Sequence, residues 1–130
     1  MSSEITGTLH ELGDTDQTVA DPDDDVRGRV VVDRDDQEVG RVDGLLIDDG
    51  RRVRFLRVAE GGLLGFLATH YLVPVEAVVA VDPDCVRIDT QRSGMTDVPG
   101  YDPELATLPT YYGTVYGWWG VPPYWGVYPR

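Results

Sequence analysis

Residues 39–58 read VGRVDGLLIDDGRRVRFLRV, and this stretch decides the fold. Two apolar runs flank Asp49-Gly50, a pair that tolerates the positive φ of a tight hairpin turn. Gly44 interrupts the first run and predicts a β-bulge, because a glycine inside a strand pattern often marks one. The stretch therefore predicts a β-hairpin with strands over Val39–Asp48 and Val53–Ala59.

Further short strands are expected on both sides of this hairpin. They cover Arg29–Asp33, Thr69–Pro74, Val78–Val81 and Val86–Asp89. Turn residues separate the runs, and short strands with turn signals between them are typical of a small barrel or sandwich. The sequence therefore predicts one small all-β domain over residues 26–92.

Several motifs in this order resemble the PRC-barrel family. They are Gly40-Arg41-Val42, Leu45-Leu46-Ile47-Asp48, residues 53–58, Gly61-Gly62-Leu63-Leu64-Gly65 and residues 71–78. Val75 departs from the pattern, because many members carry an aromatic residue after the proline. The family includes the H subunit of the photosynthetic reaction centre and the C-terminal half of a ribosome maturation factor. The resemblance implies a six-stranded PRC-type β barrel that makes protein contacts, often as a dimer.

Two segments of different composition flank the expected barrel. Residues 1–25 carry eight acidic residues, no basic residue and no aromatic residue. Such a segment buries too little apolar area to offset its ordering entropy, so we expect a disordered acidic arm. Residues 93–130 hold nine of the twelve aromatic residues and six of the nine prolines. Glycine and proline at this density argue against a regular helix and predict an extended aromatic tail.

The charge and the single cysteine indicate a compartment. The net charge is −12, every basic residue is an arginine, and Cys85 has no second cysteine with which to form a disulfide. The N-terminal residues lack the basic and apolar regions of a signal peptide, and no apolar run has the roughly 20 residues of a membrane span. We therefore expect a cytoplasmic protein without membrane insertion.

Few residues offer a nucleophile or a base. There is no lysine, and the serines (Ser2, Ser3 and Ser93) lie in the flanking segments and outside any Gly-x-Ser-x-Gly motif. Cys85 directly precedes the expected strand Val86–Asp89, where a packed or half-exposed small residue is the simpler interpretation. His70 is expected to be a strand-edge histidine bonded to a neighbour. We therefore expect a protein that is not an enzyme.

The sequence contains no complete motif for a metal site or a phosphate site either. His10 and His70 have no partner ligand at zinc spacing, and Asp21, Asp23 and Asp25 lack the glycine and terminal glutamate of an EF-hand. The glycines of residues 61–65 lack the lysine of a phosphate-binding loop. The sequence predicts no metal and no cofactor.

The leading functional prediction is a protein-interaction and assembly module that forms a homodimer. Tyrosine and tryptophan are common interface anchors, and the C-terminal segment concentrates them. An alternative is that these side chains complete the core of the chain's own barrel. The candidate interaction residues are Tyr111, Tyr112, Tyr116, Trp118, Trp119, Tyr124, Trp125 and Tyr128.

Two other functions stay open at this point. The family's ribosomal branch suggests a ribosome- or RNA-associated factor, and four arginines over residues 51–57 form a local basic patch. An acidic pI near 4.3 makes nucleic-acid binding a poor fit. These arginines are instead expected to pair across strands with Asp35, Asp36, Asp43 or Asp48. The H subunit suggests an accessory role in a membrane-bound electron-transfer complex, which fold analogy alone cannot carry.

Overall fold

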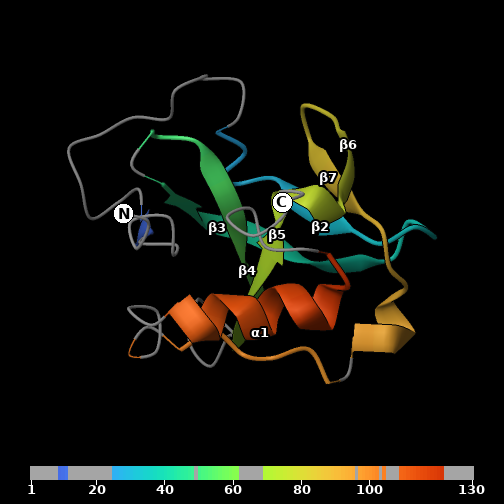
Figure 1. The fold of residues 1–130 in the computed structure, drawn as a ribbon. Helices are drawn as coiled ribbons and strands as arrows, with labels where there is room; N and C mark the ends of the chain where they lie inside the picture. The colour runs from blue at the N-terminus through green and yellow to red at the C-terminus, as the bar shows by residue number, and fades with distance from the viewer. Residues whose placement is uncertain are drawn as a thin grey trace.

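The structure is a computed structural model that describes residues 9–11, 25–48, 50–61, 69–95, 97–102, 104 and 109–121. Strands make up most of their regular secondary structure (Figure 1). In chain order the elements are β1 (His10–Glu11), β2 (Val30–Val32), β3 (Glu38–Ile47), β4 (Val53–Glu60), β5 (Thr69–Pro74), η4 (Val75–Ala77), β6 (Val78–Val81), β7 (Cys85–Ile88), η5 (Arg92–Met95) and α1 (Pro109–Trp119).

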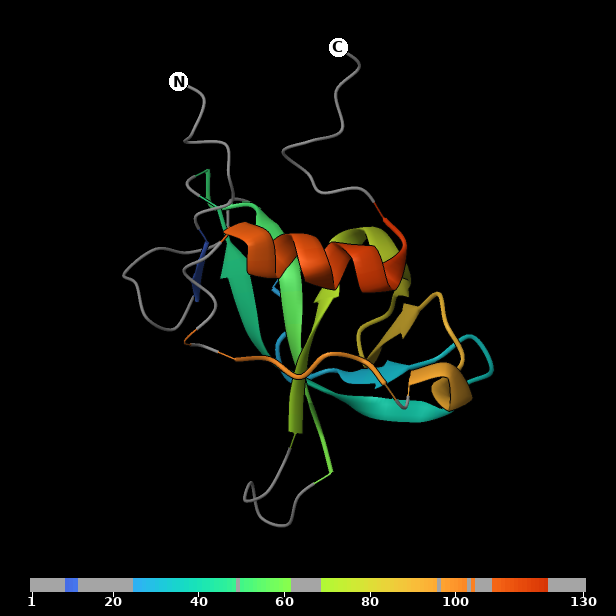
Figure 2. The same ribbon diagram turned by 60° about the horizontal axis from the view of Figure 1, so that its bottom comes forward.

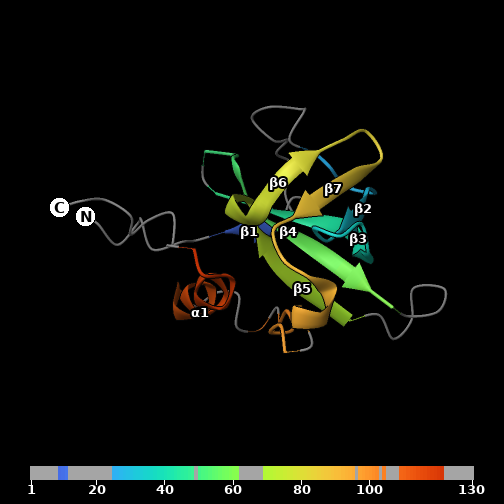
Figure 3. The same ribbon diagram turned by 90° about the vertical axis from the view of Figure 1, so that its right-hand side faces the viewer.

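Strands β2 to β7 follow the order β5-β4-β3-β2-β7-β6 in one mixed sheet, which curls into a half-barrel (Figures 1 and 3). Among the described strands, only β2 and β7 pair in parallel. β1 lies off this path and pairs with the C-terminal end of β3. The predicted all-β fold with six barrel strands is confirmed, and each predicted strand lies within a few residues of its predicted bounds.

The hairpin between β3 and β4 has its turn one residue later than the sequence predicts. Arg51, with φ 64°, is the residue in the left-handed region. Its N–H donates to the carbonyl of Asp48 at 2.9 Å, and the N–H of Asp48 donates to the carbonyl of Arg52 at 3.0 Å. A loop of three residues closed by a left-handed residue is the next most common hairpin connection after the two-residue turn.

Glycines allow two irregularities in β3. The predicted bulge is confirmed, because the register with β4 shifts between Val42 and Gly44. Gly40 has φ 152°, and a Cβ there would stand 2.6 Å from a methyl group of Val58 and 2.7 Å from the carbonyl oxygen of Ala59. Only glycine permits this close crossing of β3 and β4.

One face of the sheet curls around the first core. Its side chains come from every strand of the half-barrel and are almost all aliphatic. Tyr71 is the exception, and its buried hydroxyl donates to the carbonyl of Val39 at 2.9 Å. Burial raises the pKa of Tyr71, so the hydroxyl stays protonated and keeps this bond.

The opposite face of β3, β4 and β5 carries a second core beneath α1, which lies across these strands in Figure 2. Successive side chains of a strand point to opposite faces, so Leu46 faces α1 while its neighbours Leu45 and Ile47 face the first core. The buried members of the second core are Leu46, Phe55, Leu72, Tyr112, Val115 and Tyr116.

The prediction that residues 93–130 form an extended tail without a regular helix is wrong over Pro109–Trp119, which form α1. The helix begins at a proline, where the missing N–H costs nothing, and its interior contains no other proline. It ends at Gly120, with φ 74°, where Val121 N–H donates to the carbonyl of Tyr116 at 3.2 Å. Packing of one aromatic face on the sheet outweighs the propensity cost of its two internal glycines.

The predicted acidic arm lies mostly outside the described residues. Of residues 1–25, the structure describes 9–11 and 25, and His10–Glu11 pair with Leu46 and Ile47 of β3 as a two-residue strand. At residues 10 and 11 the arm is therefore extended and paired with the sheet. Within the described ranges, no helix is long and apolar enough to cross a bilayer.

Candidate functional site

The β5 end of the sheet is covered by the chain's own C-terminal extension. The backbone N–H of Tyr101 donates to the carbonyl of His70 at 2.7 Å. The indole N–H of Trp119 donates to the carbonyl of Leu72 at 2.9 Å. His70 and Leu72 are two residues apart on an edge strand, so these donors satisfy successive carbonyls on its free edge.

Five of the eight aromatic residues predicted from the sequence as interaction residues lie on α1. Tyr112 and Tyr116 are fully buried in the second core, with ring centroids 5.5 and 4.8 Å from that of Phe55. Trp118 and Trp119 are half-buried against the first core and meet edge to face, with centroids 4.9 Å apart. The extension therefore completes the chain's own core at these positions, as the alternative interpretation expects.

Of the other four predicted aromatic residues, the structure describes only Tyr111. Tyr111 is half-buried, and its hydroxyl accepts from the backbone N–H of Asp102 at 3.2 Å. Burial raises the pKa of this Tyr111 hydroxyl. Tyr124, Trp125 and Tyr128 lie outside the described residues.

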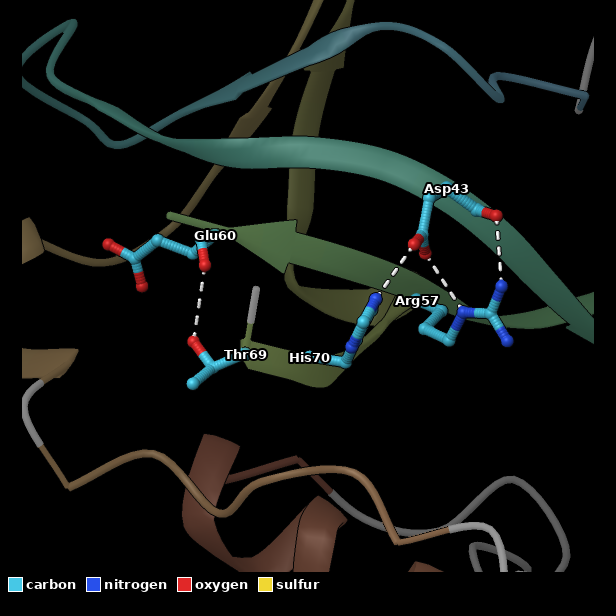
Figure 4. A network of polar contacts seen from close by, with 5 residues as sticks. All are labelled: Asp43, Arg57, Glu60, Thr69 and His70. Carbon is cyan, nitrogen blue, oxygen red and sulfur yellow. Dashed lines mark hydrogen bonds and ion pairs between the residues drawn. The ribbon is translucent and has the colours of Figure 1, made fainter. Parts of the chain in front are cut away.

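A polar network lies on β3, β4 and β5, where Asp43, Arg57 and His70 converge (Figure 4). One carboxylate oxygen of Asp43 accepts from Arg57 Nε at 2.8 Å, and the other lies 2.9 Å from His70 Nε2. Arg57 also donates to the backbone carbonyl of Asp43 at 3.1 Å. The prediction of a histidine bonded to a neighbour is confirmed.

A cavity of about 450 Å³ lies beside this network and is lined by both polar and apolar groups. Glu60, Thr69 and His70 supply the polar side chains. The Thr69 hydroxyl donates to the backbone carbonyl of Glu60 at 3.3 Å, and the Asp43 carboxylate already binds the Arg57 guanidinium (Figure 4). The Thr69 hydroxyl and the Asp43 carboxylate are thus engaged in contacts between neighbouring strands.

Two of the four arginines of residues 51–57 form cross-strand pairs that the sequence predicts, whereas the other two expected aspartates bind elsewhere, Asp36 to Arg87 and Asp35 to Gln91. Arg54 Nε lies 2.8 Å from Asp48, and Arg57 Nε lies 2.8 Å from Asp43. Asp48 also accepts from the backbone N–H groups of Gly50 and Arg52, at 2.8 and 3.0 Å. Burial opposes ionisation of Asp48, but the N–H of Arg52 and the Arg54 guanidinium together keep its pKa below the usual value.

Cys85 is the first residue of β7 and is half-buried, as the sequence predicts. Its thiol points to the Asp82 carboxylate at 3.6 Å. Desolvation, together with this carboxylate, raises the pKa of the Cys85 thiol. The thiolate, the reactive form, is therefore disfavoured.

The β6 end of the sheet differs from the β5 end. In the part of the chain that the structure describes, β6 pairs with β7 alone. Val79 and Val81 are 57% and 50% exposed and are the exposed large hydrophobic residues of the described ranges. Beside them lies a groove of about 450 Å³. It is lined by Val26, Val53, Leu56, Val75, Val78, Val81 and Val86.

A comparison of the sequence with protein families agrees with the curled six-stranded sheet seen in the structure. The family model of the PRC-barrel domain matches residues 20–94. The chain belongs to the PRC-barrel family. The matched range contains the PRC barrel of β2 to β7, together with the open edge and its groove, whereas α1 lies beyond it. No curated protein sequence matches the chain.

Neither the exposed β6 edge nor the helix is among the sequence predictions, although the helix has a signal in the sequence. Tyr112, Val115, Tyr116 and Trp119 are spaced i, i+3, i+4 and i+7, the pattern of one helical face. The groove has no such pattern, because exposure of the β6 valines depends on which segments fold back over them.

Proposed function

We propose that this PRC barrel is a non-catalytic protein-interaction and assembly module that associates with itself as a homodimer. The observation that supports the proposal best is the β6 edge, which pairs only with β7 among the described residues and where Val79 and Val81 are exposed beside an apolar groove. Unpaired strand edges and clustered exposed apolar side chains are the usual marks of an interaction surface.

The polar groups of the barrel favour a structural role over a catalytic one. Asp43 is shared between Arg57 and His70, and the Thr69 hydroxyl is bonded to a backbone carbonyl. Each contact joins residues of different strands, as expected for cross-strand stabilisation. The Cys85 thiol has a raised pKa, which suits an inert side chain better than a nucleophile.

The alternatives considered from the sequence gain no specific support. Of the arginines that would contact phosphate, Arg54 and Arg57 are paired with Asp48 and Asp43. A net charge of −12 adds long-range repulsion against nucleic acid. We therefore propose protein contacts alone.

Sedimentation velocity of the full chain tests self-association directly. Between about 5 and about 200 µM, we expect the weight-average sedimentation coefficient to rise from the monomer value towards that of a dimer, as for a weak interface. A sedimentation coefficient that stays at the monomer value over this range would contradict the homodimer. Assays for hydrolysis of generic ester and phosphate substrates should give no turnover above that of heat-denatured protein.

A further inference from the structure

A cavity of about 450 Å³ lies at the β5 end of the sheet, where the barrel meets the C-terminal extension. Strands β3, β4 and β5 supply part of its lining, and Met95, Val98 and Gly100 supply the rest. The backbone N–H of Tyr101 donates to the carbonyl of His70 at 2.7 Å and so anchors the extension beside it. Met95, Val98 and Gly100 lie beyond the range that matches the PRC-barrel domain, so the cavity is a feature of the whole chain and not of the barrel alone.

The cavity combines apolar and polar groups as ligand sites do. Such sites typically measure about 300–1,000 Å³ and place a few polar groups among apolar side chains. Val39, Met95 and Val98 contribute apolar side chains here, and four side chains of β4 and β5 contribute polar groups. A small molecule with an apolar body and one polar group therefore matches the cavity.

The polar side chains of β5 offer acceptors to such a ligand. The hydroxyls of Thr69 and Tyr71 each donate their proton to a backbone carbonyl, at 3.3 and 2.9 Å, so only their oxygen lone pairs remain. His70 Nε2 lies 2.9 Å from the Asp43 carboxylate, which also pairs with Arg57 and can only accept. The ring proton of neutral His70 is therefore on Nε2, and Nδ1 is an acceptor.

Glu60 adds a negative charge to this lining. Its side chain is half-buried, and among the described residues it forms no ion pair. Figure 4 shows its carboxylate extending away from the network of Asp43 and Arg57. Burial is the main cause of the raised pKa of Tyr71, and the nearby charge of Glu60 adds to it. Since no arginine is among the lining residues, a cation brought beside Glu60 would supply the counter-ion.

We propose that this cavity binds a small primary amine in its ammonium form, with the Glu60 carboxylate as counter-ion and the aliphatic part of the amine against Met95 and Val98. An ammonium group has donors and no acceptor, which complements side chains that offer acceptors alone. The net charge of −12 also raises the concentration of cations near the protein. This ligand site goes beyond the proposed protein contacts and does not depend on self-association.

An NMR titration of the isotope-labelled full chain with n-pentylammonium chloride tests the site. Sodium chloride keeps the ionic strength constant. We expect saturable shifts of the backbone amide signals of residues 60, 69–71 and 98–100, with a dissociation constant of about 1 mM, an affinity within reach of so small a ligand. n-Pentanol and pentanoate carry a neutral and a negative head group on a chain of the same length, and each should bind at least about tenfold more weakly.

Charge and shape are separated by three variants. Glu60→Gln keeps the shape of the side chain and removes its charge, so it should raise the dissociation constant of n-pentylammonium at least about tenfold. Glu76→Gln is the matched control, because it removes the same charge at an exposed position of η4, and it should change the constant by less than about twofold. Val98→Phe narrows the cavity without changing the charge and should also weaken binding at least about tenfold. Circular dichroism checks that each variant is folded.

Three results would overturn the site. The first is that n-pentylammonium gives no saturable shift up to about 20 mM. The second is that n-pentanol shifts the same signals with the same dissociation constant, which would remove any role for the carboxylate. The third is that Glu60→Gln and Glu76→Gln weaken binding equally, because the cation would then follow the net charge of the protein and not the cavity. None of these results bears on the homodimer, which the sedimentation experiment tests separately.

Discussion

Strands β5 and β6 are the two edge strands of one sheet, and in the described residues the C-terminal extension hydrogen-bonds to β5 but not to β6. The free carbonyls of His70 and Leu72 on β5 receive donors from Tyr101 and Trp119. In the described residues, β6 has no such cover, and Val79 and Val81 are exposed. An exposed strand edge invites association, so a protein that covers one edge and leaves the other open restricts where it can associate.

The two ends of the sheet also differ in the packing that stabilises them. The β5 end is buttressed by a second core, where α1 packs on the outer face of β3, β4 and β5. The β6 end is a short hairpin on the far side of the barrel from α1 (Figure 3). We therefore expect substitutions under α1 to cost stability, and substitutions on β6 to affect association.

The largest effect is expected for Tyr112→Ala, which empties part of the second core. Tyr112 is 1% exposed, and truncating a buried aromatic residue typically costs about 3–5 kcal/mol. Urea denaturation followed by fluorescence measures this cost. Thr114→Ala, at an exposed position of the same helix, should change the free energy of unfolding by less than about 0.5 kcal/mol. Equal costs for the two variants would mean that α1 is not packed on the sheet.

Trp119→Phe tests the covered edge itself. It keeps an aromatic ring but removes the N–H that donates to Leu72, and leaving a carbonyl unpaired costs about 1–3 kcal/mol. Trp118→Phe is the matched control, because Trp118 makes an edge-to-face ring contact with Trp119. Denaturation should show a greater loss for Trp119→Phe. A greater loss for Trp118→Phe than for Trp119→Phe would mean that the hydrogen bond from Trp119 to Leu72 does not stabilise the β5 edge.

A smaller, pH-dependent effect is expected at Asp48, in the hairpin that joins the inner strands β3 and β4. Its pKa is lowered in the folded state, so its carboxylate stabilises the fold above the unfolded pKa of about 3.9. This stabilisation is lost as pH falls through the folded pKa. Asp48→Asn should cost about 1 kcal/mol at neutral pH.

The difference between wild type and Asp48→Asn should disappear in acid. Denaturation curves measured from about pH 6 to about pH 2 should converge as the wild-type carboxylate becomes protonated. Asp84→Asn, at an exposed position, is the control for a general effect of charge. A constant difference across this range would show that the charge of Asp48 is not what stabilises the hairpin.

The smallest effect on folding is expected at the open edge. Val79→Thr alters a side chain that is 57% exposed, so the free energy of unfolding of the dilute monomer should change by less than about 0.5 kcal/mol. A loss above about 1 kcal/mol would mean that Val79 is covered by another part of the chain.

The sequence predicts the strands well because local signals specify them. Pro74 ends β5 and Asp82-Pro83-Asp84 separates β6 from β7, as expected. The turn after β3 is less predictable, since a three-residue loop moves the left-handed residue from the Asp-Gly pair to Arg51. The left-handed position at Arg51, in place of Gly50, depends on strand register, which composition does not specify.

The second core was harder to foresee. Leu45-Leu46-Ile47 and Phe55-Leu56 are continuous apolar runs, and such runs indicate strands buried on both faces. They show that something covers the outer face but not which segment does so. Gly113 and Gly117 hide the helix, because its stability comes from tertiary packing and not from local propensity.

The most direct test of the account compares amide hydrogen exchange in residues 69–74 and 78–81 at several protein concentrations. If the β5 edge is closed within the chain and the β6 edge is closed by a second copy, protection of 78–81 rises with concentration while protection of 69–74 stays constant. Concentration-dependent protection at 69–74, with none at 78–81, would contradict the account, because association would then use the edge that the chain already covers.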